Sequence, residues 1–189
     1  PFIHEAIPVR GPSRRFSGFE AQMQRILSVL DGISRTTGNL VRWLALAMLL
    51  AQFLIVIARY VFGYSSIAAQ ESVLYMHATL FMLGAGYTLL NDGHVRVDIF
   101  YDKLSTSGKN RIDLAGHLLL LMPAMVMVIY WSWPAVTNAW KILEGPISVG
   151  GIKAVFLLKS LIPAFCILVL LQSLSCVLRI LFQSETRDG

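Results

Sequence analysis

The stretch LVRWLALAMLLAQFLIVIARYVFG at residues 40–63 decides the fold of this chain. It is an apolar run that only Arg42, Gln52 and Arg59 interrupt, with aromatic residues near both ends. About 20 apolar residues are enough for a helix to cross a bilayer. Aromatic side chains at both ends match the belts that membrane proteins place at the two interfaces. The stretch therefore predicts a membrane-spanning helix.

Three further apolar stretches follow at about residues 67–90, 112–133 and 152–182. The whole chain is 56% hydrophobic and only 14% charged, whereas soluble domains carry about 25% charged residues. We therefore expect an all-α integral membrane protein with four transmembrane helices over residues 39–183 and no soluble domain. The last stretch would be about 45 Å long as a helix, so it should tilt or project beyond the lipid.

The segment before the first span predicts a helix of a different kind. Residues 17–38 place apolar side chains at helical spacing among polar ones. The apolar positions are Phe19, Met23, Ile26, Leu27, Leu30 and Ile33. Such a helix is too polar to span, so it should lie in the membrane interface or pack on a partner's cytoplasmic surface. Residues 1–16 predict a flexible basic tail and residues 184–189 a short C-terminal tail.

The Lys and Arg residues indicate how the chain is oriented. Of the 16 in the chain, 12 fall in the two termini and the segment between the second and third spans. The other 4 are Arg59, Lys141, Lys153 and Lys159. Cytoplasmic loops carry the excess of Lys and Arg, so both termini should be cytoplasmic in a multi-pass protein. Because the basic residues flank apolar runs and do not form one solvated face, nucleic-acid binding is not expected.

Arg59 and Glu71 flank the turn between the first two spans and should lie at similar depth near the outer face. An ionisable group in a span is costly and usually faces protein or a cavity. Two interpretations follow. The two residues could belong to a path for protons or ions, or they could form an ion pair that stabilises helix packing or holds a partner. The second is favoured, because ion pumps usually carry several deep acids.

His77 and His117 raise the alternative of a haem b-binding anchor subunit of a redox enzyme. Their depths, counted along the helices, differ by about 5 Å, which argues against a shared haem. A small four-span exporter is a third possibility, but it would need a deep carboxylate that residues 40–63 lack.

The densest polar segment between spans is GAGYTLLNDGHVRVD at residues 84–98. It begins with small residues that allow close helix approach and ends in a turn with His94, Arg96 and Asp98. No catalytic order, phosphate loop or metal-binding pattern occurs in it. A capped, charged turn or a docking surface is therefore a better interpretation than an active site.

Several of these motifs, in this order, resemble the small membrane subunit of tripartite ATP-independent periplasmic (TRAP) transporters. They are RYVFG at 59–63, Glu71, Gly84 with Ala85, GHVRVD at 93–98 and GGIKAVFLLKSLIP at 150–163. The likeness covers about residues 40–180. The loop before Glu71 lacks the tryptophan often found there, which leaves the subgroup and the substrate open.

The resemblance implies a non-catalytic subunit of a sodium-coupled secondary transporter in the bacterial inner membrane. Its partners would be a large membrane subunit, which carries the sodium ions, and a periplasmic solute-binding protein that delivers a solute, often a carboxylate. The small subunit itself would need no cofactor or metal and would scaffold the large one. The resemblance assigns structural or partner-interface roles to Arg59, Glu71, Gly84, His94, Arg96 and Asp98.

Overall fold

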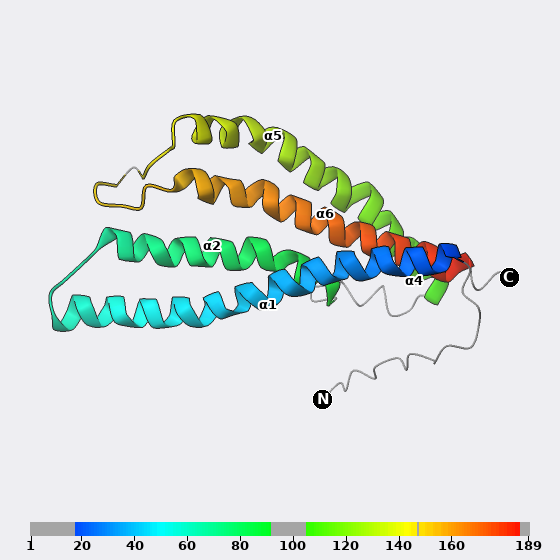
Figure 1. The fold of residues 1–189 in the computed structure, drawn as a ribbon, viewed down its shortest axis with the longest axis horizontal. Helices are drawn as coiled ribbons and strands as arrows, with labels where there is room; N and C mark the ends of the chain where they lie inside the picture. Colours follow the sequence, from blue (N-terminus) through cyan, green and yellow to red (C-terminus); the bar gives the residue numbers. More distant parts are fainter. Residues whose placement is uncertain (1–17, 92–104, 147, 186–189) are drawn as a thin grey trace.

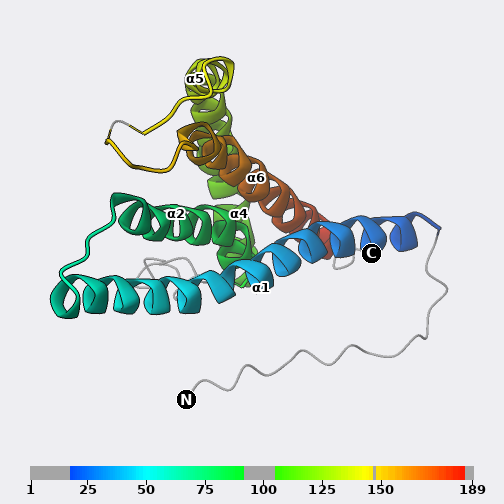
Figure 2. The same ribbon diagram turned by 60° about the vertical axis from the view of Figure 1, so that its left-hand side comes forward.

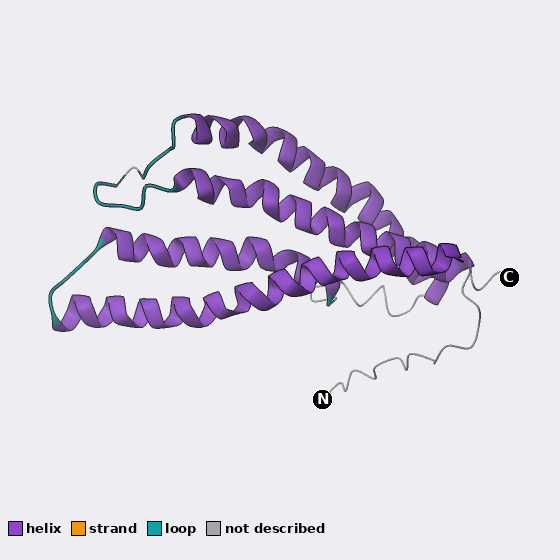
Figure 3. Cartoon of the chain, in the orientation of Figure 1, coloured by secondary structure: helices purple, strands orange, loops and turns teal. Residues whose placement is uncertain are grey.

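The computed structural model describes residues 18–91, 105–146 and 148–185, with side chains over 21–91, 105, 108–146 and 148–182. All regular structure in these ranges is helical (Figure 3). The elements are α1 Gly18–Val61, α2 Ile67–Leu90, α4 Thr106–Ala115, the π-helical turn η1 Gly116–Leu121, α5 Met122–Lys141 and α6 Val155–Glu185. Four helical stretches among them are long and apolar enough to cross a membrane, as the sequence predicts.

Helix α1 runs without a break through both the amphipathic segment and the first apolar run. The sequence predicts two elements here, at 17–38 and 40–63, but the backbone shows no boundary between them. The reason is that the pattern of side chains changes while helix formation continues: no proline occurs in α1, and the cost of Gly38 is only about 1 kcal/mol. At about 66 Å, α1 is longer than a bilayer is thick.

The third helical stretch is also longer than the predicted 112–133, because α4, η1 and α5 follow one another without a gap. In η1 the hydrogen bonds have the wider spacing of a π-helix, as in the bond from the Met122 N–H to the His117 carbonyl. Pro123 follows immediately and has no N–H to donate. The structure places the π-helical turn just before this proline, and both features are known causes of helix kinks.

The two connections at the other end of the bundle each contain a glycine with a positive φ angle. Gly63 has φ +66° and leads into Ser66, whose hydroxyl accepts the Ala69 N–H and caps α2. Gly150 has φ +86° in the loop before α6. Helix α6 begins at Val155, later than the predicted 152, because Ile152 belongs to this loop and bonds to another helix.

The helices form a row in the order α1, α2, α6, α5 (Figures 1 and 2). Neighbours in the row pack along their lengths, whereas α5 makes no comparable contact with α1 or α2 within the described residues. The N-terminal half of α1 additionally crosses the C-terminal part of α6 at the right-hand end of Figure 1. Among the described helices, α6 is therefore the only one that packs against all the others.

The burial of side chains agrees with the position of each helix in the row. Most fully buried side chains belong to α6: Cys166, Val169, Gln172, Ser173, Ser175 and Val177. The outer helices α1 and α5 instead expose large apolar side chains, such as Phe53, Leu54, Met127 and Trp131. In a membrane protein these apolar faces meet lipid or another subunit.

Candidate functional site

The most connected polar group in the described residues lies where α1 crosses α6, and its centre is Asp31. The Asp31 carboxylate accepts hydrogen bonds from Ser175 Oγ at 2.7 Å and from Gln172 Nε2 at 3.2 Å. Its other oxygen accepts a bond from the Arg179 guanidinium at 2.5 Å. These bonds favour the charged carboxylate over the neutral one. We call Asp31, Gln172, Ser175 and Arg179 the polar clamp.

The members of the polar clamp differ in how far their side chains are exposed. Gln172 and Ser175 are 1% exposed, while the side chain of Arg179 is 50% exposed and that of Asp31 only 14%. The guanidinium can therefore reach water or lipid headgroups while the carboxylate is held inside. This geometry ties the two helices together.

Further buried polar groups continue from the clamp across the bundle. Ser173 Oγ lies 2.9 Å from His117 Nδ1, which connects α6 to η1. Ser34, one turn beyond Asp31, is 1% exposed, and its hydroxyl has no hydrogen-bond partner within the described residues. Gly86 of α2 is buried beside it: a Cβ there would lie 3.4 Å from both Ser34 Oγ and the Leu168 carbonyl oxygen. The lack of a side chain at Gly86 thus lets α2 approach α1 and α6 closely.

Glu71, a predicted site residue, binds the loop before α6. Its carboxylate accepts the Ile152 N–H at 2.6 Å. A Cβ built on Gly151 would lie 2.5 Å from both carboxylate oxygens, so this carboxylate sits directly on the glycine backbone. The contact joins the start of α2 to the GlyGlyIleLys segment at the head of α6, two motifs that sequence reasoning treated separately.

Arg59, the expected partner of Glu71, lies in the last turn of α1 and is exposed. Within the described residues, no ion pair joins it to Glu71. The ion pair at this end of the bundle is instead Lys159 to Glu144, at 2.5 Å. Beside it, Trp140 Nε1 donates to Ser160 Oγ at 2.7 Å, which fixes the end of α5 on α6.

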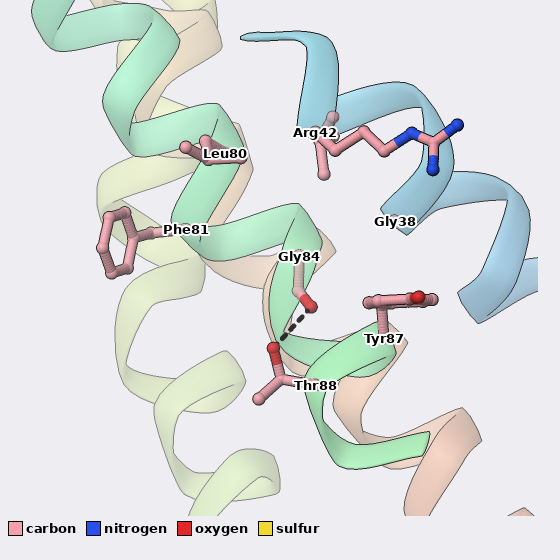
Figure 4. A pocket seen from close by; sticks show the side chains of 8 residues that line it. Gly38, Arg42, Leu80, Phe81, Gly84, Tyr87 and Thr88 are labelled. Carbon is pink, nitrogen blue, oxygen red and sulfur yellow. Dashed lines mark hydrogen bonds between the residues drawn. The ribbon is translucent and has the colours of Figure 1, made fainter. Parts of the chain in front are cut away.

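Gly84 lies in a groove between α1 and α2 with a volume of about 290 Å³ (Figure 4). Its lining includes Gly38, Val41, Arg42, Gly84, Tyr87 and Thr88. We call it the α1–α2 groove. The other predicted site residues, His94, Arg96 and Asp98, lie outside the described residues.

The two histidines considered for haem contact different groups. His77 stacks on Phe81 of its own helix with ring centroids 4.6 Å apart, whereas His117 contacts α6 through Ser173. The haem alternative is therefore not supported. Within the described ranges, no group of His, Cys, Asp and Glu side chains is arranged to hold a metal ion.

Sequence reasoning missed the polar clamp, although part of its signal was present. Gln172, Ser175 and Arg179 have the spacing of one helix face, so they form a polar stripe on an otherwise apolar helix. Such a stripe in a span indicates a contact with another polar side chain. The partner, Asp31, is 141 residues away from Gln172 in the chain, and no local pattern points to it.

The fold and its polar contacts define a class: a four-helix membrane protein whose polar groups join helices. Comparison with known protein families identifies the family within this class. Residues 35–183 match the family described as "Tripartite ATP-independent periplasmic transporters, DctQ component". The chain belongs to this family and is the small membrane component of a TRAP transporter, as the motifs predict. A search among curated proteins finds no matching sequence.

Membership of this family bears on the expected fold, on the kind of activity and on the partners. The family is a membrane family, so the all-α fold with four spanning helices is confirmed. It is a family of transporter components and not of catalysts. It also implies partnership with a large membrane subunit and a periplasmic binding protein.

Proposed function

We propose that the chain is a non-catalytic subunit of a sodium-coupled secondary transporter in the bacterial inner membrane. In this proposal the transporter imports a solute, most simply a carboxylate, that a periplasmic binding protein delivers. The chain supplies a fixed helical wall for the large membrane subunit, and the sodium ions bind that larger partner.

The observation that carries the scaffold role is how polar and apolar side chains are distributed. Asp31 and His117 make polar contacts to α6, and Glu71 makes one to the loop that leads into it. Large apolar side chains are exposed along most of the length of helices α1 and α5. Carriers instead place polar groups and broken helices around a site at the bilayer midplane. A central helix held by polar contacts, with apolar faces on the outer helices, suits a supporting role.

A reconstitution experiment tests this function. Proteoliposomes with the chain, its large subunit and the binding protein should take up the solute when a sodium gradient points inward. Vesicles with this chain alone should show only background uptake under the same gradient. Sodium-driven transport by the chain alone would contradict the proposal, as would full uptake by the large subunit without it.

The proposed orientation places both termini in the cytoplasm and the loops around Gly63 and Gly150 in the periplasm. We expect a cysteine at the exposed Ser148 to react in intact cells with a membrane-impermeant maleimide. A cysteine at the exposed Ser105 should react only after the cells are opened. The unaltered chain is the control, since Cys166 is buried in α6 and Cys176 lies in the same helix. The reverse labelling pattern would invert the topology.

A further inference from the structure

The α1–α2 groove has a feature that the scaffold role does not explain: it leaves space between two helices that are otherwise in close contact. At one end, Tyr87 packs directly on α1, since a Cβ on Gly38 would lie only 2.3 Å from Tyr87 Cγ. At Gly84 the helices are further apart, and the nearest atom to a built Cβ is Val41 Cγ2 at 3.7 Å. The missing side chain at Gly84 therefore keeps the groove open (Figure 4).

The interior of the groove suits a hydrocarbon chain. Val41 and Leu80 contribute apolar surface, and the half-buried Thr88 bonds its hydroxyl to the Gly84 carbonyl at 3.2 Å. Thr88 therefore already has a hydrogen-bond acceptor within its own helix. The volume of about 290 Å³ is close to the lower end for ligand pockets, about 300 Å³. Phe81 lies along the groove and is 65% exposed, so the groove opens toward the surrounding lipid.

Among the described residues that line this apolar groove, one side chain is charged, the cation Arg42. Arg42 is exposed at the edge of the first apolar run, and its guanidinium lies 5.8 Å from the centre of the Trp43 ring. Within the described residues no carboxylate pairs with Arg42. Arginine and tryptophan at the end of a span mark the headgroup level of a bilayer. A guanidinium there can form two parallel hydrogen bonds to a phosphate.

We propose that the α1–α2 groove binds an anionic phospholipid of the surrounding leaflet. One acyl chain lies along Val41 and Gly84, and the lipid phosphate binds the Arg42 guanidinium. Charge complementarity favours this occupant, since the groove combines an apolar lining with a cation at the headgroup level, which matches an acyl chain joined to an anionic headgroup. The inference depends on the membrane location of the chain and not on the solute, the sodium ions or the scaffold role.

Photo-crosslinking in proteoliposomes tests the proposal with the full chain. The probes are phosphatidylglycerol and phosphatidylcholine, each with a photoactivatable group in one acyl chain. We expect phosphatidylglycerol to label peptides containing residues 38–43 and 80–88 at least about tenfold more than phosphatidylcholine does. Both lipids carry a phosphate, but the choline cation of phosphatidylcholine neutralises its own phosphate and is repelled by the Arg42 guanidinium. Equal labelling by the two lipids, or labelling elsewhere only, would overturn the proposal.

Three variants separate the acyl site from the headgroup site. Arg42→Gln should abolish the preference for phosphatidylglycerol, whereas Arg25→Gln, an exposed arginine on the same helix, should preserve it. Gly84→Leu should fill the groove and reduce labelling by both lipids. Gly84→Ala, whose added carbon has room, is its folding control. If Gly84→Leu does not fold, the comparison of the two arginine variants still decides the matter.

A partner helix is the competing occupant, and the same variants reveal it. In that case Arg42→Gln and Gly84→Leu would reduce co-purification of the large subunit and leave lipid labelling of the isolated chain unchanged. That combination of results would overturn the lipid proposal.

Discussion

Replacing Asp31 with alanine is expected to lower the free energy of unfolding by about 2–4 kcal/mol. The substitution leaves the Gln172 amide and the Ser175 hydroxyl, both 1% exposed, without their acceptor. Each buried polar group left unpaired costs about 1–3 kcal/mol. Arg179 adds little to this loss, because its half-exposed side chain can return to water or lipid headgroups. Titration with a denaturing detergent, followed by circular dichroism, measures the change.

Three companion variants show whether the loss comes from the polar clamp. Ser28→Ala, nearly one turn before Asp31, removes a hydroxyl that bonds only within its own helix, so it should change stability by less than about 0.5 kcal/mol. Asp31→Asn retains one carboxyl-like oxygen and should fall between the wild type and Asp31→Ala. Arg179→Gln should cost about 1 kcal/mol or less. Equal stability of Asp31→Ala and the wild type would show that the clamp does not hold α1 to α6.

The elements that the sequence predicts well are those that depend on local composition. The apolar runs and the positions of basic residues suffice to predict the number of spans, and the match of 67–90 to α2 is complete. This works because lipid leaves a spanning segment few alternatives to a continuous helix. The end of α1 is predicted within a few residues for the same reason.

The elements that sequence reasoning missed depend on contacts between distant segments. The continuity of α1 past residue 38 accompanies packing of its N-terminal half on α6, through Asp31 and Ser175. Of the apolar positions at 17–38, Leu30 is buried within this same molecule, whereas Ile26 and Ile33 remain exposed, so the interfacial helix stays a prediction. Amphipathic spacing shows that one face of a helix is covered without showing what covers it.

For the candidate site too, the sequence predicts individual residues better than the contacts between them. The motifs single out Glu71 and Gly84; Glu71 contacts the loop before α6, and Gly84 lines the α1–α2 groove. The sequence predicts Arg59, the nearest basic residue along the chain, as the partner of Glu71. The structure instead uses the Ile152 N–H, from a loop 81 residues further along the chain. A carboxylate can bind backbone N–H groups as well as cations, and no sequence pattern distinguishes the two.

The contact of Glu71 with the loop before α6 gives the second large expected effect. Glu71→Ala should lower the free energy of unfolding by about 2–3 kcal/mol, because the Ile152 N–H loses a charge-assisted acceptor. Glu71→Gln retains one acceptor oxygen and should lose about half as much. If the role is structural, both variants should weaken co-purification with the large subunit more than they alter sodium dependence of the assembled transporter. The reverse result would assign Glu71 to an ion path.

Gly151 tests the same contact from its other side, without changing a charge. The Cβ of Gly151→Ala would lie 2.5 Å from both Glu71 carboxylate oxygens, so the carboxylate or the loop must move. We expect a loss of about 1–3 kcal/mol, the usual cost of overpacking. Gly145→Ala is the matched control in the same connection, since its Cβ would meet only Lys153 Cγ, at 3.9 Å. Combining Gly151→Ala with Glu71→Ala should cost less than the sum of the two, since the second change removes the group that the first displaces. Full additivity in this cycle would show that Glu71 does not rest on Gly151 in the folded protein.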